Sequence, residues 1–160
     1  MRALLPVVLG AAMMLAGCMP GATPSTRVEA DRPPLPGVDV RLSAVDEAGK
    51  GVPVKWQDET LTLREPPLAT SADIADVRSV LDDNGFTVLQ IRYRPEAQRR
   101  IHDGTAAMVG QRMAISVDGR VLMVATVHGP FSDSMNLSGL AGSDAMALEK
   151  HITGSAPMER

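Results

Sequence analysis

The sequence of 160 residues is poor in aromatic and sulfhydryl side chains, with two Phe, one Tyr, one Trp and one Cys. A single cysteine excludes an internal disulfide. With so few aromatic residues, the core must consist of Val, Leu, Ile, Ala and Met. Basic residues are not in excess, since 16 Lys and Arg stand against 19 Asp and Glu. The overall charge therefore gives no reason to expect nucleic acid as a partner.

Common signatures of catalysis and metal binding are also missing from the sequence. It contains no Gly-x-Ser-x-Gly and no Ser-x-x-Lys motif, and its three histidines, His102, His128 and His151, are scattered. We therefore expect no enzyme, no cofactor, no small-molecule substrate and no metal site. No Met-x-x-Met pair occurs after residue 17. We expect the methionines to fill the core rather than to bind a soft metal.

The only long apolar run lies at the N-terminus. It follows Arg2, extends over residues 3–16, and is typical of a secretory signal peptide rather than of a membrane helix. The run leads into Leu-Ala-Gly-Cys18, which is similar to the lipobox of bacterial lipoproteins. That resemblance implies a signal peptide over 1–17 and a lipid anchor at Cys18, with acyl chains that hold the protein on a membrane facing the periplasm. The alternative is an ordinary signal peptide beside an unrelated cysteine.

The residue after the cysteine bears on sorting between membranes. It is Met19, whereas an aspartate there would resemble the inner-membrane retention signal, so the outer membrane is slightly favoured. Residues 1–17 hold one arginine and no acidic residue. The mature chain therefore has 15 Lys and Arg against 19 Asp and Glu, a net charge of −4.

Prolines dominate the next segment. Residues 18–37 contain five prolines and few large apolar residues, which predicts a disordered, semi-rigid tether. Residues 155–160 are expected to be a frayed tail. Between them, residues 38–60 are predicted to form N-terminal strands, and residues 61–154 the main domain.

Helices and strands alternate in the main domain. The segment 71–85 is ambiguous, because the spacing of its apolar residues favours a helix while its Asn-Gly ending also suits a hairpin. Residues 86–93 are predicted to form a strand, and Pro95 opens a helix that ends near Gly110. Gly104 lies on the packing face of this helix, so we expect another residue to approach the helix backbone closely there. A last helix over 143–153 has Ser143 or Asp144 as its N-cap and Gly154 as its stop.

A hairpin occupies residues 110–130. Two alternating apolar strands flank Asp118-Gly119, a pair suited to a type I′ turn. The second strand carries apolar residues on both faces, which predicts that it is central in its sheet. A short strand over 134–140 follows. The predicted fold class is α+β, with a mostly antiparallel sheet and two main helices on one face.

The order of these elements resembles a known family. Residues 61–154 are similar to the head subdomain of the first periplasmic domain of SecD, a subunit of the bacterial preprotein translocase. The residues that stand at the family's motif positions are Thr105, Gly110, Ala114, Ile115, Asp118, Gly119, Pro130, Leu137, Ser138 and Gly139. The resemblance implies that residues 73–77 are extended, which we adopt over the helical spacing.

The resemblance also implies a function in part. SecD has six membrane helices and works with SecF on the proton gradient, whereas the residues after Cys18 contain no apolar run of that kind. We therefore expect the module, which in the family is thought to touch the emerging polypeptide, and not the motor.

Two groups of residues are candidates for contact with a partner. Phe131 follows a Gly-Pro break, and with Met135 and Leu137 on the next strand it offers an apolar edge to an extended chain. The alternative is that Phe131 belongs to a loop that packs back on the core. Arg92, Arg94, Arg99 and Arg100 form a basic cluster, either a solvated surface or a contact for lipid head groups or an acidic partner.

These observations lead to two hypotheses. The first is a periplasmic binding module that contacts exported polypeptide or translocon components. The second is a structural or scaffolding envelope lipoprotein without a role in export. An open strand edge with apolar side chains favours the first, and a covered edge favours the second.

Overall fold

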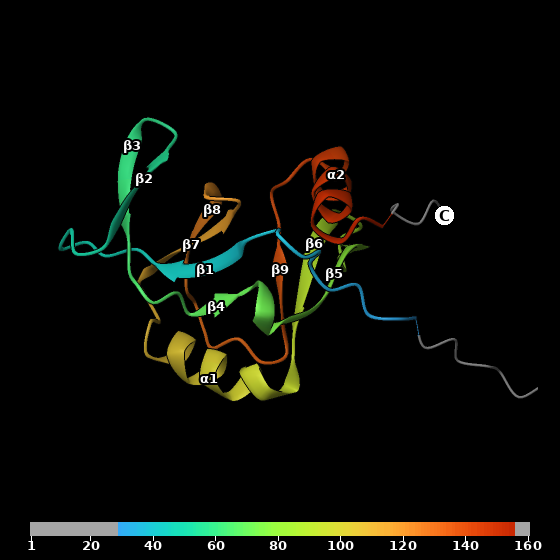
Figure 1. Cartoon of the computed structure of the whole chain (residues 1–160), viewed down its shortest axis with the longest axis horizontal. Coiled ribbons are helices and arrows are strands. Elements are labelled where there is room, and N and C mark those ends of the chain that lie inside the picture. The colour runs from blue at the N-terminus through green and yellow to red at the C-terminus, as the bar shows by residue number, and fades with distance from the viewer. Residues whose placement is uncertain (1–28, 156–160) are drawn as a thin grey trace, which may run out of the picture.

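The computed structural model describes residues 29–155, which form an α+β fold with antiparallel sheets and two helices (Figure 1). This confirms the predicted fold class. The strands are arranged in a four-stranded sheet, a three-stranded sheet and a two-stranded hairpin. Cys18 and the signal peptide lie outside the described residues.

The four-stranded sheet has the order β4-β1-β7-β8. Its strands are β1 (Val40–Ala44), β4 (Ala69–Thr70), β7 (Arg112–Val117) and β8 (Arg120–Thr126). The turn between β7 and β8 has positive φ at both Asp118 (50°) and Gly119 (76°), as a type I′ turn requires. The predicted hairpin is therefore confirmed.

The predicted central position of β8 is wrong, because β8 is an outer strand and β7 is the buried one. The apolar residues on its second face are covered by another element. The strands β2 (Val52–Trp56) and β3 (Glu59–Leu63) form a separate hairpin. Trp56 and Val54 of that hairpin pack with Val121 and Val124 of β8 in a small second core.

The three-stranded sheet has the order β5-β6-β9, with β5 (Ile74–Leu81), β6 (Thr87–Tyr93) and β9 (Ser134–Leu137). The family resemblance was right to overrule the helical spacing over β5. A bulge between Ile74 and Asp76 and burial of both faces disturb the alternation that marks an ordinary strand. A short 3₁₀ turn, Ser71–Asp73, precedes the strand.

The helices are α1 (Pro95–Ala106) and α2 (Gly142–Thr153). A Cβ atom at Gly104 would lie 2.3 Å from Leu68 Cδ1, so the predicted close approach to the α1 backbone is present. The predicted N-cap of α2 is wrong, because Ala141 occupies that position without a side-chain hydrogen bond. Gly154 ends α2 in the left-handed conformation, as predicted.

The two larger sheets and both helices share one core. Its completely buried residues include Val77, Leu89, Ile101, Leu137 and Ala145. The structure differs from the sequence prediction at the tether, because residues 29–37 run along the domain and make specific contacts with β5 and α2. Charged side chains of this proline-rich segment find partners that are distant in the sequence.

Candidate functional site

The common core opens at one side into a groove of about 340 Å³ between β8 and β9. Its walls come from β7, β8, β9 and the loop after β8. The lining residues are Met113, Ile115, Met123, Ala125, Thr126, His128, Gly129, Phe131, Met135, Asn136 and Leu137. The groove therefore lies where the two sheets separate.

Both strands beside the groove are outer strands. β8 pairs only with β7, and β9 pairs only with β6. Within residues 29–155, no further strand is hydrogen-bonded to the free side of either one. An outer strand keeps unpaired N–H and C=O groups, with which an extended chain can pair.

The chemistry of the groove is apolar and uncharged. None of its lining residues is Asp, Glu, Lys or Arg, and His128 is the one titratable side chain among them. Three of the lining residues are methionines, whose flexible thioethers adapt to partners of different shape. The groove therefore suits apolar side chains without selecting for charge.

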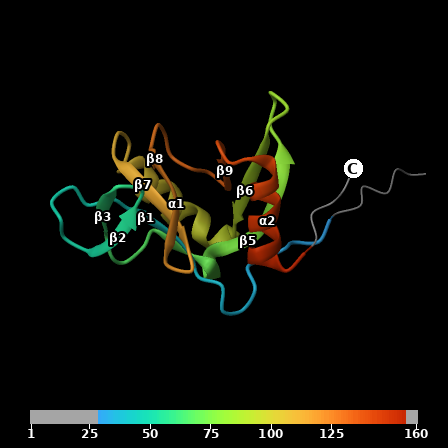
Figure 2. The same cartoon turned by 90° about the horizontal axis from the view of Figure 1, so that it is seen from above.

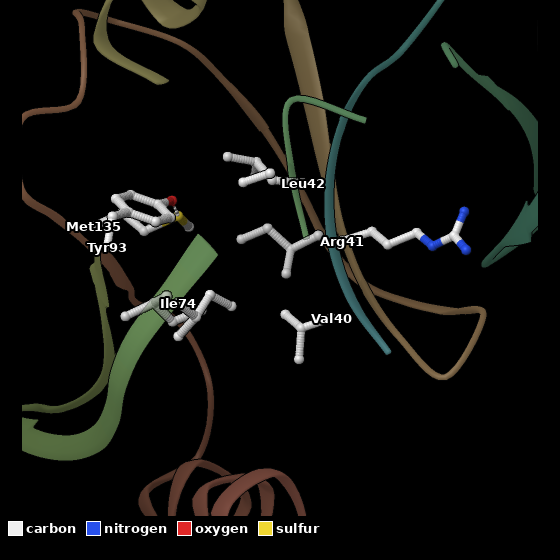
Figure 3. Close-up of a pocket in the computed structure, with 9 residues that line it drawn as sticks. Val40, Arg41, Leu42, Ile74, Tyr93 and Met135 are labelled. Carbon is white, nitrogen blue, oxygen red and sulfur yellow. Dashed lines mark hydrogen bonds between the residues drawn. The ribbon is translucent and has the colours of Figure 1, made fainter. Parts of the chain in front are cut away.

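Met135 connects this groove to the interior. The hydroxyl of Tyr93 donates to Met135 Sδ at 2.7 Å. Burial, together with the charge of Asp73, raises the pKa of the Tyr93 hydroxyl far above its ordinary value, so that this group stays a donor. Figure 3 shows both side chains turned towards Leu42 and Ile74, whereas the side chain of Arg41 points away. The void there is only about 10 Å³ and has an apolar lining, so we interpret it as a packing defect.

The three apolar residues predicted to contact a partner have different positions. Phe131 is half-buried and packs against the core, and its backbone N–H donates to Thr105 Oγ1 at 2.9 Å. Met135 is partly exposed at the groove. Leu137 is 0 % exposed and belongs to the core, so its side chain lies at the base of the groove rather than on the surface. All three line the same groove, and their contact with a partner remains a prediction.

The predicted arginine cluster is largely engaged with carboxylates. Arg92 pairs with Asp31, and Arg100 pairs with Asp73 at 2.6 Å. Arg99 is 95 % exposed and lies 3.9 Å from Asp103. Arg94 is half-buried and forms the N-cap of α1. A contact between these arginines and an acidic partner stays a prediction.

Sequence reasoning missed part of the groove. The sequence predicts that the methionines fill the core, and Met113 and Met123 also line the groove, together with Ile115, because the core is open between β8 and β9. Reasoning from the sequence also did not identify the exposed tip of the β5–β6 hairpin, where Leu81 is 59 % and Phe86 is 69 % exposed. The Asp-Asp-Asn-Gly turn between these two residues was the available signal.

Two other features are absent from the described residues. Residues 29–155 contain no group of three His, Cys, Asp or Glu side chains arranged to hold a metal ion. Over the same range, no helix combines the length and the apolar character needed to cross a bilayer.

Comparisons with known proteins point to one family. The chain is 41 % identical over 56 residues to the protein translocase subunit SecDF of Thermus thermophilus, covering 35 % of this chain and 8 % of the relative. It is 35 % identical over 66 residues to SecD of Rhodobacter capsulatus, covering 41 % and 12 %. It is 28 % identical over 130 residues to SecD of Acidaminococcus fermentans, covering 78 % and 30 %. The chain thus spans less than a third of the length of these relatives.

Solved structures show the same fold. A structure of SecDF in its super-membrane-facing form matches with a TM-score of 0.58 and 22 % identity, over 74 % of this chain and 19 % of that one. A second SecDF structure, described as a membrane component that enhances protein export, matches with a TM-score of 0.55 and 22 % identity, over 75 % and 65 %. A family model described as SecDF, P1 head subdomain, matches residues 47–156. The chain therefore belongs to the SecDF P1 head subdomain family.

Proposed function

We propose that this protein is a non-enzymatic, lipid-anchored periplasmic module that binds extended apolar polypeptide during protein export. One observation carries the proposal: an uncharged, methionine-rich groove lies between two outer strands, β8 and β9. A translocating chain is unfolded, so it offers free backbone groups and exposed apolar side chains together. The groove complements both, because its strands have unpaired backbone groups and its lining is apolar.

Binding would follow the physics of strand addition. A segment laid along the free side of β9 forms backbone hydrogen bonds with a strand of four residues. Every second side chain of the segment then points into the groove, towards Met113, Met123 and Met135. Backbone pairing and adaptable thioethers are both insensitive to sequence, which suits a module that meets many different chains.

The link to export is supported by the relatives. One solved SecDF is described as a component that enhances protein export. We propose that exported polypeptides or translocon components are the partners here as well. We assign these contacts to the groove, because binding there needs no membrane helix.

Membrane attachment through Cys18 is a separate part of the proposal. It is supported by the Leu-Ala-Gly-Cys sequence that follows the apolar run. Cells fed an alkyne-tagged palmitate should label the protein, and Cys18→Ala should abolish the label, because the chain has no second cysteine. Fractionation of the labelled protein then tests the expected preference for the outer membrane. Equal labelling of the variant would exclude this anchor.

Photo-crosslinking in living cells tests the binding role. A photoreactive phenylalanine replaces Phe131 beside the groove, and the same probe at the exposed Lys50 serves as the control. We expect crosslinks to many exported chains or to translocon subunits from the Phe131 probe alone. A single discrete envelope partner would favour a scaffolding lipoprotein instead. No product above the control would exclude binding at the groove.

A further inference from the structure

The outer edge of β5 is closed by the segment 29–37, here called the leader. Val77 of β5 donates its N–H to the carbonyl oxygen of Arg32 at 3.0 Å. The N–H of Arg32 donates to Asp76 Oδ1 at 2.8 Å. The leader therefore lies along β5 on the side where the sheet ends, held by one backbone hydrogen bond and by one to the Asp76 carboxylate.

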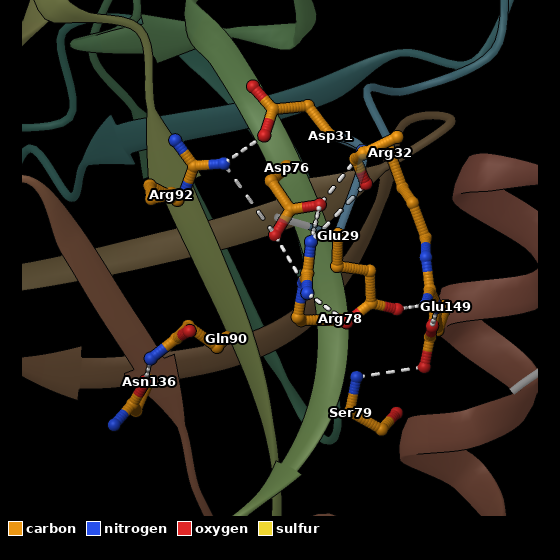
Figure 4. Close-up of polar contacts among 11 residues, drawn as sticks. Glu29, Asp31, Arg32, Asp76, Arg78, Ser79, Gln90, Arg92, Asn136 and Glu149 are labelled. Atoms are coloured by element: carbon orange, nitrogen blue, oxygen red, sulfur yellow. Dashed lines mark hydrogen bonds and ion pairs between the residues drawn. The ribbon is translucent and has the colours of Figure 1, made fainter. Parts of the chain in front are cut away.

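The side chain of Arg32 then reaches across to α2. Its Nη1 lies 2.6 Å from Glu149 Oε1, and the other oxygen of Glu149 accepts the N–H of Ser79 at 2.8 Å. Figure 4 shows Arg32 between Asp76 on β5 and Glu149 on α2. One arginine thus joins the leader, the strand and the helix.

Burial explains why this arginine matters. Glu149 is 1 % exposed and Asp76 is 2 % exposed. A buried carboxylate is costly unless a cation and hydrogen bonds compensate it. Asp76 Oδ2 also accepts a hydrogen bond from Arg78 Nε at 2.5 Å. For Glu149, Arg32 is the one basic side chain within ion-pair distance among residues 29–155.

Downstream contacts hold the leader in the same path. The N–H of Leu35 donates to the carbonyl oxygen of Ile152 at 2.7 Å. Leu35 Cδ1 would lie 3.1 Å from a Cβ atom at position 154, so Gly154 makes room for it. The described chain thus enters the domain beside α2, at the end opposite the β2–β3 hairpin (Figures 1 and 2).

We propose that Asp76 and Glu149 form a docking site on the β5 edge that recognises an extended arginine-containing segment and holds the leader through Arg32. Asp76 accepts the backbone N–H of the arginine, and Glu149 binds its guanidinium. The planar guanidinium suits this site, because Nη1 pairs with Glu149 while Nη2 pairs with Glu29 of the leader itself. Docking closes one sheet edge against other chains. It also fixes the end of the domain from which the upstream chain departs.

Amide hydrogen exchange in the full mature chain tests this site. We expect Arg32→Ala to speed exchange at Val77 at least about tenfold, because this amide loses its acceptor, the carbonyl oxygen of residue 32, when the leader leaves. Exchange at Ile115, in the other sheet, should stay unchanged. Protection at Val77 equal to that of the wild type would overturn the proposal.

A peptide added in trans tests recognition of the guanidinium itself. The peptide carries residues 29–37, and it should restore protection at Val77 in the Arg32→Ala chain. The same peptide with alanine for arginine should not. Equal rescue by both peptides would overturn the proposal. If Arg32→Ala does not fold, Arg32→Lys takes its place, because lysine keeps the positive charge without the forked guanidinium. The amide of Val77 in Arg32→Lys should still exchange about threefold faster than in the wild type.

Discussion

β5 and β9 are the two outer strands of one sheet, and their free sides differ in character. The side of β5 carries Asp76 and is covered by the leader, with Glu149 of α2 beside it. The side of β9 faces an open groove whose lining contains no Asp, Glu, Lys or Arg. An exposed strand edge promotes unwanted pairing, and proteins usually cover or charge it. The fold applies that protection to one edge and leaves the apolar edge accessible.

This contrast supports a division of roles within the sheet. Buried ion pairs on the β5 side fix where the leader lies, because their geometry is specific. Methionines on the β9 side tolerate different partners, because they impose little geometry. We interpret the β5 side as an attachment surface and the β9 side as a binding surface. The variants below test that contrast, starting with the largest expected effect.

Leu137→Ala tests the assignment of Leu137 to the core of β9. Because this side chain is 0 % exposed, its truncation should lower the free energy of unfolding by about 3 kcal/mol. Asn136→Ala, at the exposed neighbouring position, is the control and should change it by less than about 0.5 kcal/mol. Urea denaturation measures both variants. Equal effects of the two would show that Leu137 is not inward-facing.

Asp76→Asn tests the attachment surface. The amide can still accept the N–H of Arg32, but it loses the ionic hydrogen bonds with Arg78. We expect a loss of about 2 kcal/mol, less than for a fully enclosed pair because Arg78 is 19 % exposed. Asp31→Asn removes an exposed partner of Arg92 and should cost less than about 0.5 kcal/mol. If both variants unfold at the same urea concentration as the wild type, the buried network does not stabilise the fold.

Thr105→Val tests how the wall of the groove is positioned. The hydroxyl of Thr105 accepts the N–H of Phe131, and valine keeps its shape without this acceptor. We expect a loss of about 1 kcal/mol and faster amide exchange at Phe131. The neighbouring Ala106→Ser, at an exposed position of α1, should leave exchange at Phe131 unchanged. Unaltered exchange in Thr105→Val would mean that another contact holds the loop.

Asp118→Asn has the smallest expected effect, at the turn between β7 and β8 of the other sheet. The N–H of Asp39 and then His151 hold the pKa of Asp118 below its ordinary value. A lowered pKa in the folded state means that the stabilisation is present at neutral pH and disappears as the pH falls through that pKa. The wild type should therefore melt slightly above the variant at pH 7, and the difference should shrink as the pH falls below the ordinary aspartate pKa of 3.8. A difference that stays constant over this pH range would contradict this interpretation.

Local signals in the sequence predicted most of the strands and turns. Asp118-Gly119 predicted the hairpin because few residues other than Asn, Asp and Gly adopt positive φ there. Gly154 predicted the end of α2 for the same reason. β5 could not be identified from periodicity alone, since burial on both faces removes the alternation of a half-exposed strand.

Long-range packing explains what the sequence did not predict. The second apolar face of β8 is covered by Trp56 and Val54 of a hairpin that is distant in sequence, so β8 resembled a central strand. Arg32 meets Asp76 and Glu149 across 44 and 117 residues, and its proline-rich surroundings suggested only a tether. The groove itself depends on which strands end each sheet, and the order of strands along the chain does not determine this.

Methyl NMR of the methionines tests the central claim most directly. Met123 and Met135 line the groove, whereas Met146 lies on α2, is 40 % exposed and does not line the groove. We would label the methionine methyl groups with ¹³C and titrate the protein with a permanently unfolded polypeptide. We expect saturable shifts of the Met123 and Met135 signals and a stationary Met146 signal. Shifts confined to Met146, or no shifts at all, would contradict binding in the groove.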